Sequence, residues 1–146
     1  MSSSKKLLSL VLSVFAFSSL AVAGSPQDER HELMEGVKDG AQVIGPMLQG
    51  KVDYDADAAV AALKGWEEAA QSFGDLFPDG SEGGEAAPAI WEDRAGFEEA
   101  LQMWQDATAK AIAANPQTLE EARPAIGPVF DTCKNCHDTY RIEEDE

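Results

Sequence analysis

Residues 118–141, TLEEARPAIGPVFDTCKNCHDTYR, decide the fold. Thr118 and Glu121 have the spacing of a capping box, which predicts that a helix begins here. The apolar residues that follow recur at helical spacing and predict one buried face. That face consists of Ala122, Ile126, Val129, Cys133, Cys136 and Tyr140. Pro124 and Pro128 interrupt the pattern, and we expect Pro128 to bend this helix or to delay its regular part.

Three earlier segments also repeat apolar residues every three or four positions, which predicts three more helices. We expect them over residues 26–49, 55–76 and 88–114. A polar, glycine-rich loop, residues 78–85, separates the second helix from the third. No alternating pattern of a β-strand stands out. Four helices of about 20 residues with short connections predict an all-α, antiparallel up-down-up-down four-helix bundle.

The amino terminus has the pattern of a secretory signal peptide. Two lysines precede an apolar stretch, residues 7–20, and a small-residue cleavage site follows at 21–23. The apolar stretch is short for a membrane span, although an amino-terminal anchor is the alternative. We therefore expect residues 1–23 to be removed and residues 24–146 to form one domain in the periplasm, with no membrane insertion of the mature chain.

The chain is strongly acidic, with 27 Asp and Glu against 11 Lys and Arg and a net charge of −16. The expected signal peptide contains two of the lysines and no acid, so the mature chain has 27 acids against 9 bases, a charge of −18. Such a charge argues against nucleic acid and anionic membranes as partners. We interpret it as a well-solvated surface, and the sequence identifies no redox partner.

Residues 133–137, CKNCH, form a C-x-x-C-H motif, which is typical of haem attachment. On a helix these positions share a face, so two thiols can reach the two vinyl groups of a porphyrin while the imidazole reaches the iron. A thioredoxin-like pair would need a preceding strand, and a zinc site would need four ligands, which only His31 and carboxylates could complete. The motif predicts one covalently bound haem c, attached at Cys133 and Cys136, with His137 as an iron ligand.

Further landmarks occur in a fixed order along the chain. They are Arg30 with Met34, Gly50, Tyr54-Asp55, Leu76-Phe77-Pro78, Ile90-Trp91-Glu92-Asp93, Phe97, and finally Cys133, Cys136, His137, Tyr140 and Arg141. In this order and spacing the sequence resembles the class II cytochromes c, and within them the cytochromes c′. The resemblance spans the mature chain from about Asp28 to Arg141.

The resemblance implies that His137 is the proximal ligand and that Met34 lies on the distal face of the haem. In cytochromes c′ the distal residue packs over a five-coordinate, high-spin iron that binds NO and CO. Low-spin relatives use a methionine of this helix as the sixth ligand and carry electrons, and a thioether is a reasonable iron ligand. Met34 alone does not decide between these two functions.

Four further residues are candidate haem contacts, two of them, Arg30 and Glu85, through the resemblance. Arg30 matches an arginine beside the propionates, where a guanidinium can pair with a carboxylate; an ordinary surface arginine is the alternative. Glu85 matches a loop position near the haem edge. His31 is a candidate for a second haem-edge contact or a distal ligand, although a surface position suits it better. Arg141 lies one turn after His137 and can influence its basicity. Arg30 favours the cytochrome c′ interpretation.

The expected function is therefore that of a haem protein that binds small diatomic gases and has the capacity for electron transfer. Catalysis needs an acid–base residue above the iron. Met34 and its neighbours Leu33 and Val37 supply none, so we expect no enzyme unless His31 faces the haem. The resemblance further implies a homodimer that pairs through the first two helices.

Overall fold

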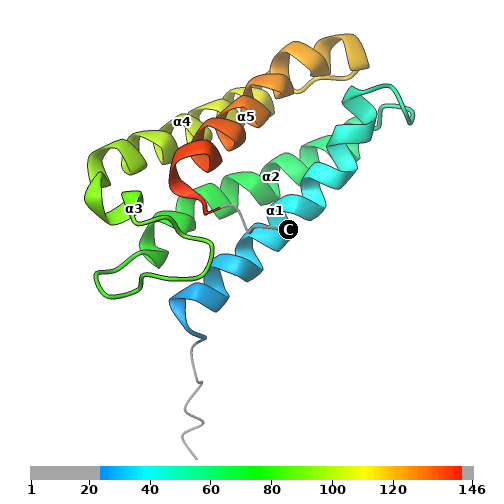
Figure 1. Ribbon diagram of the computed structural model, residues 1–146. Helices are drawn as coiled ribbons and strands as arrows, with labels where there is room; N and C mark the ends of the chain where they lie inside the picture. Colours follow the sequence, from blue (N-terminus) through cyan, green and yellow to red (C-terminus); the bar gives the residue numbers. More distant parts are fainter. Residues whose placement is uncertain (1–23, 143–146) are drawn as a thin grey trace, which may run out of the picture.

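The computed structural model describes residues 24–142, so the expected signal peptide and the last four residues lie outside it. The elements in this range are α1 (Pro26–Leu48), α2 (Ala56–Ser72), η1 (Phe73–Leu76), α3 (Ala89–Glu92), α4 (Arg94–Ala114) and α5 (Leu119–Tyr140). The four long helices, α1, α2, α4 and α5, form an antiparallel bundle (Figure 1). The predicted all-α four-helix architecture is confirmed. Between residues 24 and 142, no helix is long and apolar enough to cross a membrane.

The long helices begin where local sequence satisfies their free backbone N–H groups. Each follows a residue whose side chain accepts a hydrogen bond from the backbone N–H three positions later. These residues are Ser25, Asp55, Asp93 and Thr118. Such caps stabilise a helix by about 1 kcal/mol each. The cap at Thr118 agrees with the sequence analysis.

The third expected helix is divided in the structure, so its predicted continuity was wrong. The backbone of Asp93 leaves the helical region (φ −125°, ψ 61°), and its carboxylate accepts the N–H of Gly96 at 3.2 Å. This aspartate ends α3 and caps α4, as residues of its type commonly do. The second expected helix is also shorter than predicted, because α2 ends at Ser72 and the chain tightens into η1.

α5 runs unbroken through both of its prolines. A proline inside a helix lacks the N–H of one backbone hydrogen bond, but the cap at Thr118 starts this helix before Pro124. Of the two outcomes expected at Pro128, the delay of the regular helix was therefore wrong, and the bend stays a prediction. As a consequence, residues 133–137 lie in regular α-helix.

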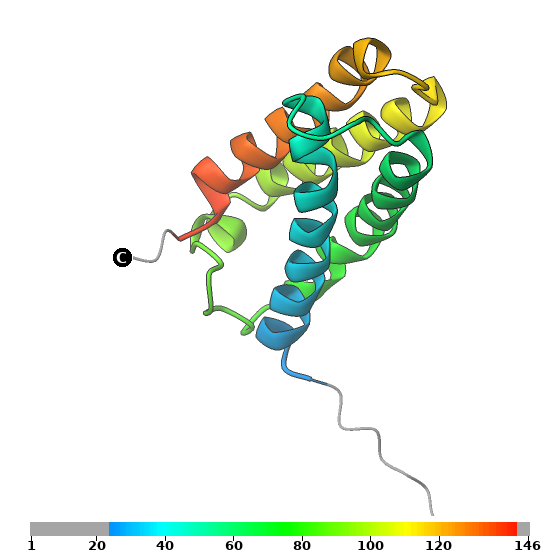
Figure 2. The ribbon, with the colours of Figure 1, turned by 90° about the vertical axis from the view of Figure 1, so that its right-hand side faces the viewer.

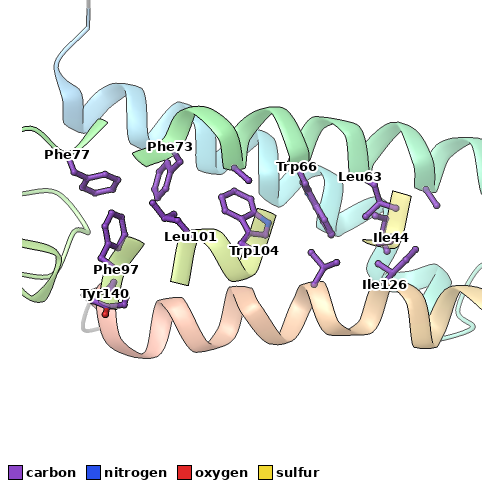
Figure 3. Packing of buried hydrophobic residues seen from close by; sticks show 14 of the residues in the cluster. Ile44, Leu63, Trp66, Phe73, Phe77, Phe97, Leu101, Trp104, Ile126 and Tyr140 are labelled. Carbon is purple, nitrogen blue, oxygen red and sulfur yellow. The ribbon is translucent and has the colours of Figure 1, made fainter. Parts of the chain in front are cut away.

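Aromatic rings fill the core near the end of α5 (Figure 3). The ring of Phe77 meets Phe73 and Phe97 edge-on, with centroid distances of 5.0 and 4.8 Å. Phe97 in turn contacts Tyr140 at 5.3 Å. Edge-to-face pairs stabilise the fold by about 0.5–1.5 kcal/mol each beyond their burial. This packing fixes the last turn of α5, one turn beyond His137.

α1 and α2 approach each other closely where Trp66 meets Gly40. The indole Nε1 of Trp66 donates to the backbone oxygen of Val37 at 2.9 Å, and the ring is buried. A Cβ atom at Gly40 would lie only 2.5 Å from that nitrogen. Glycine is therefore needed at position 40 because the two helices leave no space for a side chain.

The long helices form two packed pairs. α1 packs mainly on α2 and α5 mainly on α4, while the contact of α2 with α4 joins the pairs. Figure 2 shows the bundle from the side on which α1 lies in front. α1 and α5 contact each other only slightly. We call this boundary the α1–α5 seam; Met34 belongs to α1, and the C-x-x-C-H motif belongs to α5.

Candidate functional site

The last turns of α5 place the motif residues on one face. Because the helix is regular up to Tyr140, Cys133, Cys136 and His137 stand at positions i, i+3 and i+4 of an α-helix. Both thiols are free and half-buried, and Cys136 packs against the hydrophobic core. The chain therefore presents two thiols and an imidazole on the same side of α5.

Burial keeps the two thiols protonated. Desolvation raises the pKa of Cys133, although hydrogen bonds with its own backbone and with Thr132 oppose the shift. Desolvation and the neighbouring Cys133 raise the pKa of Cys136 to about 11. A thiol with a raised pKa is a weak metal ligand and a weak redox nucleophile at neutral pH. Neither cysteine has the depressed pKa that a thioredoxin-like pair requires.

His137 is held in its neutral form. The residue is exposed, but enough protein surrounds its imidazole that desolvation lowers its pKa, and the charge of Arg141 adds to this effect. The charges of Glu85 and Asp138 act in the opposite direction. The neutral imidazole is the form that binds iron.

α1 carries apolar residues that pack against the core. Leu33, Met34 and Val37 are half-buried and pack against the core. Their helix packs only slightly on α5, which carries the motif. α1 thus carries thioether and hydrocarbon side chains against the core, while the thiols and the imidazole belong to α5.

Arg30 is buried and does not behave as a surface arginine. It is only 6% exposed, and burial lowers its pKa. Nη1 donates to the carbonyl oxygen of Leu76 at 3.2 Å, while Nη2 donates to those of Ser81 at 2.9 Å and Gly83 at 3.2 Å. The guanidinium also lies 4.7 Å from the ring centre of Phe77. Among residues 24–142 no carboxylate pairs with it, so its charge is unneutralised there.

Three other predicted residues come together beside the end of α5. Arg141 Nε donates to Glu85 Oε2 at 2.7 Å. His31 Nδ1 lies 3.8 Å from Glu85 Oε1, and its side chain is 66% exposed. Glu85 therefore stands between α1 and α5. No local sequence pattern predicts that these three side chains contact one another, because they belong to three separate segments.

Sequence reasoning missed one further interaction near the motif. The hydroxyl of Tyr140 donates to Asp93 Oδ2 at 3.2 Å. A Cβ atom at Gly96 would lie 2.5 Å from that hydroxyl oxygen, so glycine is needed there. The sequence pattern placed Tyr140 on the buried face, but its polar partner depends on the unforeseen break at Asp93. This bond ties α5 to the start of α4, three residues after His137.

The donors fit a covalently attached haem better than a zinc ion. Within the described residues, no group of three or more His, Cys, Asp and Glu side chains is placed to bind an ion, whereas structural zinc takes four ligands. A haem needs two thiols on one turn, an imidazole next to them and an apolar surface facing them. α5 supplies the first two, and α1 carries half-buried apolar side chains that could supply the third.

Known proteins are similar to this chain over most of its length. The sequence matches the family described as Cytochrome C' over residues 25–141. It is 39% identical to a cytochrome c' of Alcaligenes xylosoxydans xylosoxydans over 101 residues, which cover 66% of this chain and 76% of that protein. It is 33% identical to a cytochrome c-556 of Agrobacterium tumefaciens (strain II Chrys) over 119 residues, 80% of this chain and 97% of that protein.

The fold is similar to that of the same class of protein. The structure of a nitric oxide complex of a variant cytochrome c prime from Alcaligenes xylosoxidans matches with a TM-score of 0.68 and 32% identity. The match covers 82% of this chain and 98% of that one. Cytochromes c′ and c-556 are c-type haem proteins, the class that the C-x-x-C-H motif predicted. The chain therefore belongs to the cytochrome c′ family.

Proposed function

We propose that this chain is an exported haem protein in which Cys133 and Cys136 form thioether bonds to one haem c and His137 ligates its iron. The observation that carries the proposal is the placement of all three donors on one face of an unbroken helix. Each protonated thiol can add across a vinyl group, so that a sulfur–carbon bond forms and the thiol hydrogen passes to the neighbouring carbon. The bound haem supplies an iron that exchanges one electron and accepts small ligands.

The charged residues then surround the haem edge. Arg30 has the charge to pair with a propionate, because no carboxylate in the described chain neutralises it and its Nε is not used in the hydrogen bonds of its side chain. His31 and Glu85 are proposed contacts at the edge, and Arg141 acts on His137 from one turn away. These roles agree with the grouping of the last three side chains beside α5.

We propose that Met34 packs over the iron without ligating it, and that the open position binds NO or CO. Support comes from the apolar face of α1, where Leu33, Met34 and Val37 are half-buried. A closed apolar pocket admits small uncharged diatomics and excludes charged ligands, whose desolvation is costly. This face offers no acid or base, so we propose binding and electron transfer and no catalysis.

The second candidate is a low-spin electron carrier in which Met34 is the sixth ligand. The chain is similar to cytochromes c-556 as well as to cytochromes c′, and this similarity supports the second candidate function. A thioether ligand would raise the reduction potential. The two candidates therefore differ in a single iron–sulfur bond.

Two measurements test the proposal. Mass spectrometry should show a chain that begins near Gly24 and carries one haem, and acid–acetone extraction should remove the haem only from the Cys133→Ala, Cys136→Ala double variant. The ferrous spectrum should be high-spin and should change with CO, and Met34→Ala should leave the resting spectrum almost unchanged. A low-spin wild-type spectrum that becomes high-spin in Met34→Ala would assign the protein to the electron carriers instead.

We further propose a periplasmic location and a homodimer formed through α1 and α2. The signal-peptide pattern of residues 1–23 supports the location. On α1, Val43 is 42% exposed, and Val52 lies exposed just beyond the end of that helix. Exposed apolar side chains on these elements are suited to contact a second copy.

A further inference from the structure

Glu85 lies in the loop between η1 and α3 and touches the end of the helix that carries the haem-binding motif. We propose that Glu85 is a positioning residue for the proximal side of the haem: it holds Arg141 beside His137 and so fixes how strongly that positive charge acts on the iron. The inference rests on the proposed function, because it takes His137 to be the iron ligand.

Glu85 holds Arg141 through both its side chain and its backbone. The carboxylate accepts the Arg141 Nε–H at 2.7 Å, and the backbone oxygen of Glu85 accepts the N–H of Ile142 at 2.8 Å. Next to it, the N–H of Ala87 donates to the backbone oxygen of Tyr140 at 3.0 Å. The loop and the end of α5 are thus joined at several points, and the guanidinium meets a carboxylate whose backbone is fixed.

The other end of this loop is attached to α1. Arg30 Nη2 binds the carbonyl oxygens of Ser81 and Gly83, and Gln27 Nε2 donates to the carbonyl oxygen of Glu82 at 2.9 Å. Exposed ion pairs usually contribute little, because two mobile side chains must be ordered to form them. Here the loop is already ordered by α1 and α5, so less entropy is lost when Arg141 pairs with Glu85.

The charges of this pair act at the proximal imidazole. Arg141 lies one helical turn after His137, and its backbone N–H donates to the His137 carbonyl oxygen at 3.2 Å. A positive charge near the haem favours ferrous over ferric iron, so its distance from the haem affects the reduction potential. If Glu85 releases Arg141, the guanidinium can move into water, where its charge is screened.

A double-mutant cycle on the haem-loaded protein tests the proposal. The variants are Glu85→Gln, Arg141→Gln and both together, and the readouts are the midpoint potential and the iron–imidazole stretching band of the ferrous protein. We expect Arg141→Gln to lower the potential of the wild type. In the Glu85→Gln background the same substitution should produce less than half of that shift, because Arg141 has already left its place.

Glu82→Gln is the matched control, because it removes a carboxylate from the same loop whose side chain is exposed and does not contact Arg141. In the Glu82→Gln background, Arg141→Gln should lower the midpoint potential as much as it does in the wild type. In the Glu85→Asp background, it should lower the potential by part of that amount. Equal shifts in the wild-type and Glu85→Gln backgrounds, or no shift in either, would overturn the inference. A wild type without haem bound to Cys133 and Cys136 would instead overturn the proposed function.

Discussion

The contact between Gly40 and Trp66 can be tested with two glycine substitutions in one helix. Gly40→Ala would place a Cβ atom 2.5 Å from the Trp66 indole nitrogen. The ring cannot move away easily, because it is buried, packs edge-on against Phe130 at 5.4 Å and donates to Val37. Gly36 lies one turn earlier in α1 and is exposed, and a Cβ atom there meets nothing within 4 Å. The two substitutions add the same atom in opposite surroundings.

The expected stabilities of these variants differ in sign. Replacing glycine by alanine inside a helix stabilises it by about 1 kcal/mol, which is the full effect expected for Gly36→Ala. At position 40 the same gain is opposed by about 1–3 kcal/mol of overpacking. Displacement of Trp66 from Val37 costs a further ~1–3 kcal/mol, because a buried donor loses its partner. Gly40→Ala should therefore be less stable than the wild type by about 1–5 kcal/mol.

Denaturant unfolding of the haem-loaded variants, followed by far-ultraviolet circular dichroism, measures both effects under the same conditions. Gly65→Ala on α2 is a second control, since its Cβ atom also meets nothing within 4 Å. Gly40→Ala with a stability equal to that of Gly36→Ala would show that α1 and α2 do not approach as closely as described.

Three further predictions concern the bundle and its assembly. Gly96→Ala should destabilise the fold by about 1–3 kcal/mol, because the new methyl group collides with the Asp93 cap and the Tyr140 hydroxyl; an unchanged unfolding midpoint would contradict this. Burial and the hydrogen bond to Asp93 raise the pKa of Tyr140. The protonated Tyr140 hydroxyl therefore stabilises the folded protein below the unfolded pKa of about 10, and this contribution is lost as the pH rises through the raised pKa of the folded protein. Tyr140→Phe should therefore lose less stability than the wild type between neutral and strongly alkaline pH. The proposed homodimer should weaken as salt is removed, because repulsion between two acidic chains is then less screened; sedimentation that shows a monomer at both low and high salt would refute it.

The features that the sequence predicted depend on neighbours three or four residues apart. The apolar stripes and the C-x-x-C-H turn are of this kind, so both can be recognised from residue spacing in the sequence. The hydrogen-bond partners of Arg30 do not depend on such near neighbours, because Leu76 and Ser81 lie 46 and 51 positions away. The path of the loop after η1 determines these hydrogen bonds, and no local sequence pattern predicts that path.

The break at Asp93 was missed for a different reason. A single aspartate within an otherwise continuous apolar stripe has the same pattern as a solvent-exposed residue of an unbroken helix. Only its backbone angles and its bond to the N–H of Gly96 show that it ends one helix and caps the next. The pairing of Glu85 with Arg141, 56 positions apart, was likewise not encoded in either segment alone.

The slight contact between α1 and α5 has a consequence for how the protein matures. Each packed pair, α1 with α2 and α4 with α5, joins consecutive long segments of the chain, and contacts between nearby segments form quickly during folding. Two helical hairpins can therefore assemble before any cofactor arrives. If haem attaches at Cys133 and Cys136 as proposed, the weakly packed boundary between α1 and α5 would be the last part of the bundle to close. The cofactor would then complete the tertiary structure.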